Sequence, residues 1–185
     1  MTSSPRVWIR DFRDEDVPAA NALTNHFIEH TSVHFALTPA TDEAFREAWA
    51  EAQPAWPWIV AEVQGHFAGY CKASAWRTRA AYAKTAETGL YVEESARGQG
   101  IGQMLYLAML HRLKRMGFRT VVAGVALPNP ASERLHEAMG FRQVGVFHAV
   151  GYKFDTWHDV AWWERDLASL TPLPDGPTTA PRGRS

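Results

Sequence analysis

The spacing of hydrophobic residues changes repeatedly along the chain and predicts strands alternating with helices. Val7–Arg10 is expected to form the first strand. A helix is expected to begin near the acidic triplet Asp14–Asp16, because acids stabilise a first helical turn. The apolar residues that follow recur at helical spacing, at Val17, Ala20, Leu23, Phe27 and Ile28. A second helix is expected from Thr41, as its N-cap, to about Ala52.

The middle of the chain predicts a hairpin, a loop and a further strand. The apolar segments 58–63 and 67–74 flank a short turn at residues 64–66, as in a β-hairpin. The polar stretch 75–82 is expected to be a loop, and residues 85–92 are expected to form the strand that follows it.

The second half predicts two helices and three strands. One amphipathic helix is closed by Gly117, and its apolar residues are Ile101, Leu105, Met109, Leu113 and Met116. A buried strand at 121–126 and a helix from Pro130 to Gly140 follow. Strands are expected at 143–150 and 157–165.

This alternation predicts one domain over residues 1–170, with a mixed α/β sheet and helices on both of its faces. Residues 171–185 are rich in Pro, Gly, Thr and Ser and are expected to form a disordered tail.

Composition narrows the class of protein. The chain has 185 residues, of which 46% are hydrophobic, enough for one buried core. A net charge of −1, with no basic stripe of interleaved aromatics, argues against nucleic-acid or anionic-membrane partners. The single cysteine, Cys71, excludes an intrachain disulfide, fits a reducing compartment and is expected to lie in a buried strand. No leader and no bilayer-spanning apolar stretch is visible, so a cytoplasmic location is expected.

The most informative segment is the glycine-rich stretch Arg97-Gly98-Gln99-Gly100-Ile101-Gly102-Gln103, which opens the third helix. Glycines let a ligand approach the backbone, and the free N–H groups of a helix start suit phosphate oxygens. Arg97 adds a permanent positive charge. The spacing matches neither a Walker loop nor a dinucleotide fingerprint. Tight packing without any ligand is the alternative explanation for the glycines.

Arg97, Gly100 and Gly102 carry the pattern Arg/Gln-x-x-Gly-x-Gly/Ala. This pattern resembles the pyrophosphate loop of the GCN5-related N-acetyltransferases, which bind acetyl-coenzyme A. Within that superfamily the chain resembles the phosphinothricin acetyltransferases and their methionine sulfone and sulfoximine relatives. The resemblance covers residues 5–166 and includes the strings Leu127-Pro128-Asn129, Arg134-Leu135-His136-Glu137-Ala138-Met139-Gly140-Phe141, Gly151-Tyr152-Lys153 and Trp157-His158-Asp159-Val160.

The resemblance implies the superfamily's mixed, mostly antiparallel twisted sheet, with acetyl-CoA as cosubstrate and a homodimer. It also implies a cofactor site. The pantetheine arm would lie along the backbone of Leu90, Tyr91 and Val92, the pyrophosphate on the glycine-rich segment from Arg97 to Gln103, and Asn129 would bind the pantetheine amides.

Glu87 is the candidate catalytic base. It lies on the strand that leads to the glycine-rich segment, where the family places its catalytic glutamate. A carboxylate with an ordinary pKa of about 4.3 is a weak base, so Glu87 would act through water or by binding the ammonium. The alternative is a glutamate on a solvated strand face.

His136 is the second catalytic candidate. Asn129, Ser132 and His136 occupy the positions where the superfamily has Asn, Ala and a tyrosine that faces the thiolate. Histidine titrates near neutrality, so it is expected to assist at sulfur or at the amine. Packing against the cofactor is the alternative role.

The acceptor pocket is expected to contain Phe35, Arg77, Arg79 and Tyr82. Two guanidiniums are suited to clamping a carboxylate and a phosphinate or sulfonyl group, although a solvated loop is the alternative. Many phosphinothricin acetyltransferases carry an arginine directly after this phenylalanine, whereas this chain has Ala36.

Two further sets of residues, three histidines and three tryptophans, are expected to have no role in the chemistry. His26, His30 and His34 recur every fourth residue but have no obvious acidic or cysteine partner, so they are expected on the surface or a dimer face rather than on a metal. Trp157, Trp162 and Trp163 are expected in the core or in a subunit interface.

The sequence therefore predicts a cytoplasmic N-acetyltransferase that transfers acetyl directly from acetyl-CoA to the amine of a small amino-acid-like acceptor. Phosphinothricin is the first candidate acceptor and methionine sulfone or sulfoximine the alternative; a protein N-terminus is less favoured. The rival from another class is an acetyl-CoA-binding module without activity, which would need neither Glu87 nor His136.

Overall fold

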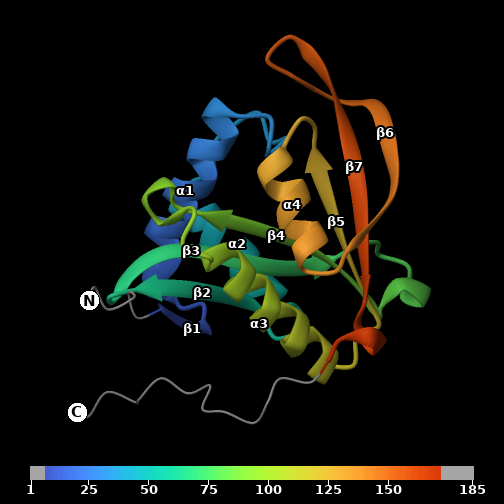
Figure 1. Cartoon of the computed structure of the whole chain (residues 1–185). Coiled ribbons are helices and arrows are strands. Elements are labelled where there is room, and N and C mark those ends of the chain that lie inside the picture. The colour runs from blue at the N-terminus through green and yellow to red at the C-terminus, as the bar shows by residue number, and fades with distance from the viewer. Residues whose placement is uncertain (1–6, 172–185) are drawn as a thin grey trace.

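The computed structural model describes residues 7–171 (Figure 1). Within them one seven-stranded sheet has the order β1-β2-β3-β4-β5-β7-β6. Its strands are β1 (Val7–Asp11), β2 (Trp58–Val63), β3 (His66–Ala75), β4 (Thr85–Val92), β5 (Thr120–Ala126), β6 (Arg142–Lys153) and β7 (Thr156–Asp166). Neighbouring strands are antiparallel except β4 and β5, which are parallel. The predicted mixed, mostly antiparallel sheet is confirmed.

Four α-helices flank the sheet within the described residues: α1 (Val17–His30), α2 (Asp42–Ala52), α3 (Ile101–Arg115) and α4 (Pro130–Ala138). Their ends follow from local chemistry. Thr41 caps α2 as predicted, since its hydroxyl accepts a hydrogen bond from the Ala44 N–H at 3.2 Å. Four short 3₁₀ turns, at Asp14–Asp16, Ala80–Tyr82, Glu94–Ala96 and Leu167–Ser169, were not predicted. The tail predicted beyond residue 171 lies outside the described residues.

Two hydrophobic clusters hold helices on opposite faces of the sheet (Figure 1). On one face, α3 buries Leu105, Met109, Leu110 and Leu113, and α4 packs beside it. On the other face, aromatic side chains fill the space under α1 and α2, and Tyr70 stacks on Tyr91 with ring centroids 5.2 Å apart. Helices on both faces are thus confirmed. The prediction that Met116 belongs to the apolar face of α3 was wrong, because Met116 follows the end of the helix and is 37% exposed.

Strands β4 and β5 separate part-way along their length. They pair only at Thr85↔Thr120, Ala86↔Val121 and Glu87↔Val122. Beyond Glu87, β4 continues to pair with β3, and β5 with β7. The facing edges of β4 and β5 therefore carry backbone groups that bond to no strand, which creates an opening in the middle of the sheet.

Cys71 is fully buried and unpaired, as expected from its apolar strand. Within residues 7–171, no helix combines the length and the apolar character that crossing a bilayer requires.

Candidate active site

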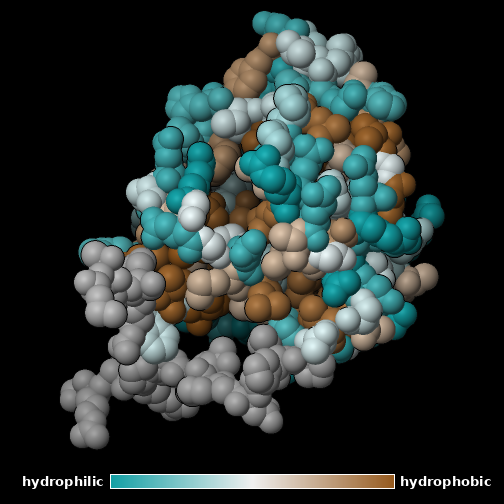
Figure 2. Space-filling view, in the orientation of Figure 1, coloured by the Kyte–Doolittle hydropathy of each residue, from teal (hydrophilic) through white to brown (hydrophobic). Residues whose placement is uncertain are grey.

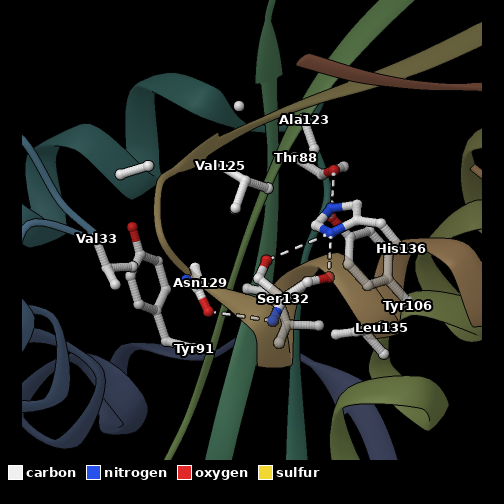
Figure 3. A pocket seen from close by; sticks show the side chains of 14 residues that line it. Val33, Thr88, Tyr91, Tyr106, Ala123, Val125, Asn129, Ser132, Leu135 and His136 are labelled. Atoms are coloured by element: carbon white, nitrogen blue, oxygen red, sulfur yellow. Dashed lines mark hydrogen bonds between the residues drawn. The ribbon is translucent and has the colours of Figure 1, made fainter. Parts of the chain in front are cut away.

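A pocket occupies the opening between β4 and β5 (Figure 3). Residues of the two separated strands form its sides, at 88–91 and 123–126. On the α3 and α4 face it is lined by Tyr106, Asn129, Ser132, Leu135 and His136. Val33, from the loop that follows α1, lines it on the opposite face. The pocket is thus lined by residues from both faces of the sheet.

The glycine-rich segment adopts the geometry expected of an anion-binding helix start. Gly98 and Gly100 have φ of +74° and +79°, values that side-chain-bearing residues adopt only with strain. Among the described residues, no atom lies within 4 Å of where a Cβ would be at either position. Gly100 is also the N-cap of α3 and has no side chain to cap the helix. The first-turn N–H groups of α3 are therefore free to bind a ligand.

Gly102 has a different role from its two neighbours. A Cβ at this position would lie 3.3 Å from a Leu135 side-chain carbon and 3.7 Å from one of Leu90. Its missing side chain therefore allows α3 to pack closely on α4 and β4. Of the other predicted cofactor residues, Arg97 is exposed and lies over the Phe27 ring, and Gln99 donates a hydrogen bond to the Ser95 carbonyl.

Asn129 both caps α4 and lines the pocket. Its Oδ1 accepts a hydrogen bond from the Ser132 N–H at 3.1 Å. The amide nitrogen of the same side chain donates no hydrogen bond within residues 7–171, so it is free to bind a ligand in the opening.

His136 lies in a series of buried hydrogen bonds on the α3 and α4 face (Figure 3). Its Nδ1 is 2.7 Å from the Ser132 carbonyl, which only accepts, so Nδ1 carries the proton. Its Nε2 is 2.8 Å from the Tyr106 hydroxyl, which therefore donates to it. The Thr88 hydroxyl lies 3.2 Å from that of Tyr106. Both ring nitrogens of His136 are thus occupied by the protein.

Burial keeps the hydrogen-bonded side chains of His136 and Tyr106 uncharged. His136 is 4% exposed, and burial lowers its pKa, although the hydrogen bond to the Ser132 carbonyl opposes this. Burial also raises the pKa of Tyr106 well above its usual range, so the hydroxyl keeps its proton. A direct role of His136 at a ligand would require one of these buried hydrogen bonds to break.

Glu87 lies on the opposite face of β4 from Thr88, at the last position where β4 pairs with β5. It is half-buried, and burial raises the pKa of its carboxyl, while the positive charge of Lys72 lowers it. A raised pKa makes the carboxylate a stronger base than an exposed glutamate. The alternative of an ordinary solvated glutamate does not fit this environment.

The structure places Lys72 beside Glu87, a neighbour that the sequence analysis missed. In the β3–β4 register Lys72 opposes Gly89, and Ser74 opposes Glu87, so Lys72 and Glu87 share one face of the sheet. The Lys72 ammonium lies over the Trp58 ring, 5.2 Å from its centroid. A charged residue inside the apolar run 67–73 was the available signal.

The predicted acceptor residues divide into two places. Arg77, Arg79 and Tyr82 line a second pocket together with Trp76 and Thr78, on the loop between β3 and β4. This pocket shares no residue with the one in the opening. The loop joins β4 at Thr85, two residues before Glu87.

Phe35 lies elsewhere, against the β6–β7 hairpin. Its ring centroid is 6.0 Å from that of His158, and a Cβ at Gly151 would lie 2.5 Å from the ring. Lys153 secures the same loop by donating hydrogen bonds to the carbonyls of Ile28, Thr31 and His34 at 2.5, 2.9 and 2.6 Å. The structure therefore brings Phe35 into neither described pocket.

The three histidines do not form a cluster. His26 and His30 are exposed, as predicted, with ring centroids 4.9 Å apart. His34 is partly buried and packs near Tyr91, where burial and the charges of Lys72 and Lys153 lower its pKa. His34 is thus less exposed than predicted, and a dimer face for these histidines stays a prediction. Among the described residues no group of three or more His, Cys, Asp or Glu side chains is arranged to hold a metal.

The tryptophans also differ from one another. Trp163 is in the core at 3% exposure, whereas Trp157 is 62% exposed. The core was therefore the right expectation for Trp163 but not for Trp157.

Residues 21–141 match the sequence profile described as Acetyltransferase (GNAT) family. The chain belongs to this acetyltransferase family. It is 39% identical, over 94% of its length and 95% of the relative's, to a phosphinothricin N-acetyltransferase from Streptomyces viridochromogenes. It is also 33% identical, over 86% of its length and 94% of the relative's, to an L-methionine sulfoximine/L-methionine sulfone acetyltransferase from Pseudomonas paraeruginosa.

Solved GNAT structures share the fold. A phosphinothricin acetyltransferase from Sinorhizobium meliloti, solved in complex with AcCoA, superposes with a TM-score of 0.84 and 28% identity, covering 98% of this chain and 100% of that one. Acetyl-CoA is thus the cosubstrate of this acetyltransferase, and the expected superfamily and fold are confirmed.

Proposed function

We propose that this GNAT enzyme acetylates the α-amine of a small amino acid, with phosphinothricin as the first candidate acceptor. The observation that carries the proposal is the position of Glu87, half-buried at the point where β4 and β5 separate. The name of the Streptomyces relative supports the choice of acceptor.

The residues present fit acetyl-CoA. The edge of Leu90 to Val92 that faces β5 pairs with no strand and is suited to the peptide-like pantetheine arm. The first-turn N–H groups of α3 are suited to its pyrophosphate. Arg97 would add a cation there, and the free amide nitrogen of Asn129 a donor. When bound, acetyl-CoA supplies the acetyl group as a thioester.

Glu87 would bind the acceptor's ammonium and promote loss of its proton, directly or through water. Its raised pKa supports this role, since a carboxylate buried away from water holds a proton more readily. The acceptor would approach on the Glu87 face, opposite the face that carries α3 and α4.

His136 would assist at the sulfur end by holding the Tyr106 hydroxyl in place. Both ring nitrogens are engaged, and Tyr106 lines the pocket, so the pair would shape and stabilise that end rather than release a proton.

The guanidiniums of Arg77 and Arg79 would bind anionic or sulfonyl oxygens of the acceptor, with Tyr82 beside them. Phe35, which lies against the β6–β7 hairpin, would contribute only from outside this pocket. Ala36 lacks the cation that many phosphinothricin enzymes carry there. This favours testing methionine sulfone and sulfoximine as alternative acceptors, as the Pseudomonas relative's name suggests.

We further propose that the enzyme is a cytoplasmic homodimer. Large hydrophobic side chains, among them Phe147, Val150 and Trp157, are more than half exposed on β6 and β7, where hydrophobic groups are visible at the upper right of Figure 2. One free, buried cysteine fits a reducing compartment. Sedimentation of the purified chain tests the dimer: a concentration-independent monomer contradicts it.

A thiol-release assay with acetyl-CoA tests the activity. The panel contains phosphinothricin, methionine sulfone, methionine sulfoximine, free amino acids and short peptides. Fast turnover of phosphinothricin supports the first candidate, and preference for the sulfone or sulfoximine supports the alternative. Binding of acetyl-CoA with no turnover of any amine contradicts the proposed acceptor class and favours the module without activity.

A further inference from the structure

We infer that Lys72 is the specificity-determining cation of the acceptor site, where its ammonium pairs with an anionic group of the bound amino acid. The inference rests on the proposed function, because it assigns the acceptor to the Glu87 face of β4. The anionic group is either the α-carboxylate or an acidic oxygen of the side chain, and the experiment below separates the two.

The first support is the position of Lys72. It lies on the same face of the sheet as Glu87, diagonally across the β3–β4 pair. Diagonal cross-strand neighbours are roughly 7–8 Å apart, within reach of long side chains. Lys72 and Glu87 nevertheless form no ion pair with each other, so a molecule with two charges can bridge them. An amino acid carries both required charges, since its ammonium matches Glu87 and its anion matches Lys72.

The second support is the path of the Lys72 side chain. Its Cγ and Cε lie 3.8 and 3.6 Å from where a Cβ on Gly89 would be, so the missing side chain of Gly89 leaves room for the Lys72 side chain beside β4. Gly89 itself lines the pocket in the opening. The Lys72 side chain therefore lies beside a residue of that pocket.

The third support is that the Lys72 ammonium has unused hydrogen-bonding capacity. Within residues 7–171 it donates no hydrogen bond and makes no ion pair. It lies over the Trp58 ring and interacts with the charge of Glu87 only at a distance. Lys153, the other lysine near His34, donates hydrogen bonds to three backbone carbonyls. A partly buried ammonium with three free donors favours an anion as its partner.

The charges on this face also favour an anion. Lys72 and Lys153 both act on His34, and Glu87 is the carboxylate that acts on Lys72. Once Glu87 is paired with the acceptor's ammonium, the charge of Lys72 is left without compensation. An acceptor with its own anion restores the balance, whereas an ammonium compound without an anion does not.

Four acceptors test the inference in a two-by-two design. L-Phosphinothricin has an α-carboxylate and a phosphinate, L-methionine sulfone has only the α-carboxylate, and 3-aminopropyl(methyl)phosphinic acid has only the phosphinate. Methionine sulfone amide has neither. The kcat/KM of each is measured for the unsubstituted enzyme and for Lys72→Met, Lys72→Arg and Lys84→Met. Lys84 is an exposed lysine that also lies over a ring, that of Phe118, and serves as the matched control.

We expect Lys72→Met to lower kcat/KM about 10- to 100-fold for the acceptors that carry the paired anion, mainly through KM. The amide is expected to change by less than about threefold, because it loses no ionic partner. Lys72→Arg should retain most of the preference, and Lys84→Met should leave all four values unchanged. A loss that follows the α-carboxylate or one that follows the phosphinate supports the inference and identifies the anion.

Equal changes across all four acceptors, or no change for any, would overturn the role of Lys72 while leaving the proposed activity intact. Turnover of none of the four by the unsubstituted enzyme would overturn both. Acetyl-CoA binding and thermal unfolding of Lys72→Met are measured in parallel. We expect neither to weaken, since replacing a partly buried charge by an apolar chain does not remove a hydrogen bond here.

Discussion

The two faces of strand β4 use polar groups in opposite ways. On the face toward α3 and α4, the polar side chains of Thr88, Tyr106 and His136 are buried and bonded to one another. On the face toward α1 and α2, Glu87 and Lys72 are only partly buried and make no hydrogen bond to each other. The first set is complete without a ligand and the second is not.

This difference separates structural roles from chemical ones. Unsatisfied polar groups cost free energy in a folded protein, so a site that keeps them must recover that cost on binding. We therefore assign acceptor chemistry to the Glu87 face and support of the cofactor end to the His136 face. The predictions below test this division, from the largest expected effect to the smallest.

The largest effect is expected for Glu87→Gln. Loss of the carboxylate should lower kcat/KM by about 100- to 10,000-fold, because proton removal from the amine loses its base. Acetyl-CoA affinity, measured by calorimetry, should remain unchanged, since Glu87 does not line the pocket in the opening. Glu47→Gln, on an exposed position of α2, is the matched control and should have full activity. A Glu87→Gln enzyme with unchanged activity would contradict the role of Glu87 as the base.

Tyr106→Phe should reduce stability more than chemistry. It leaves the buried Nε2 of His136 without its donor, which should lower the free energy of unfolding by about 1–3 kcal/mol in urea titrations. We expect kcat/KM to fall less than about tenfold. Tyr152→Phe, at an exposed tyrosine, should change stability by less than about 0.5 kcal/mol. Unchanged stability with a hundredfold loss of activity would instead place Tyr106 in the chemistry.

Gly100→Ala tests the backbone of the cofactor loop. The position is open, so the cost is that of an alanine at φ of +79°, about 1–3 kcal/mol, and acetyl-CoA binding should weaken as the loop relaxes. Gly145→Ala is the control, because it is equally open and has no positive φ. Equal behaviour of the two variants would argue against the left-handed loop as a binding element.

The smallest effect is expected in the pH profile of kcat/KM, measured with methionine sulfone amide. Glu87 must be ionised to act, so activity should fall as the pH drops through its raised pKa. The positive charge of Lys72 lowers that pKa, so Lys72→Met should move the acid-side fall to higher pH. His34 and Tyr91 also lie on this face, and a His34→Gln background identifies a contribution from the histidine. A fall that stays in place would contradict coupling between Lys72 and Glu87.

The sequence predicted most of the fold, since hydrophobic period and capping residues such as Thr41 are local signals. The glycine-rich segment and Glu87 could also be predicted as site residues, because the spacing between them along the chain identifies them. Lys72 and Tyr106 were missed because each is a single polar residue in an apolar run. Which of them bonds to the protein and which stays free depends on register and on neighbouring helices, which the sequence does not display.

The separation of β4 and β5 belongs to the same category. The family resemblance implied that the pantetheine arm lies along Leu90 to Val92, but the residues of β4 do not encode where pairing with β5 stops. The last paired position, Glu87↔Val122, follows from how β5 is held by β7. The position of Glu87, the proposed base, at the end of this pairing is therefore determined by tertiary structure and not by local sequence.

The most direct test of the division between the two faces is a crystal structure with coenzyme A and the acceptor bound together. We predict that the acceptor's nitrogen lies on the Glu87 face, within hydrogen-bonding reach of that carboxylate, and that the Tyr106–His136 hydrogen bond stays intact. An acceptor bound on the α3 and α4 face, with its nitrogen at His136, would contradict the account.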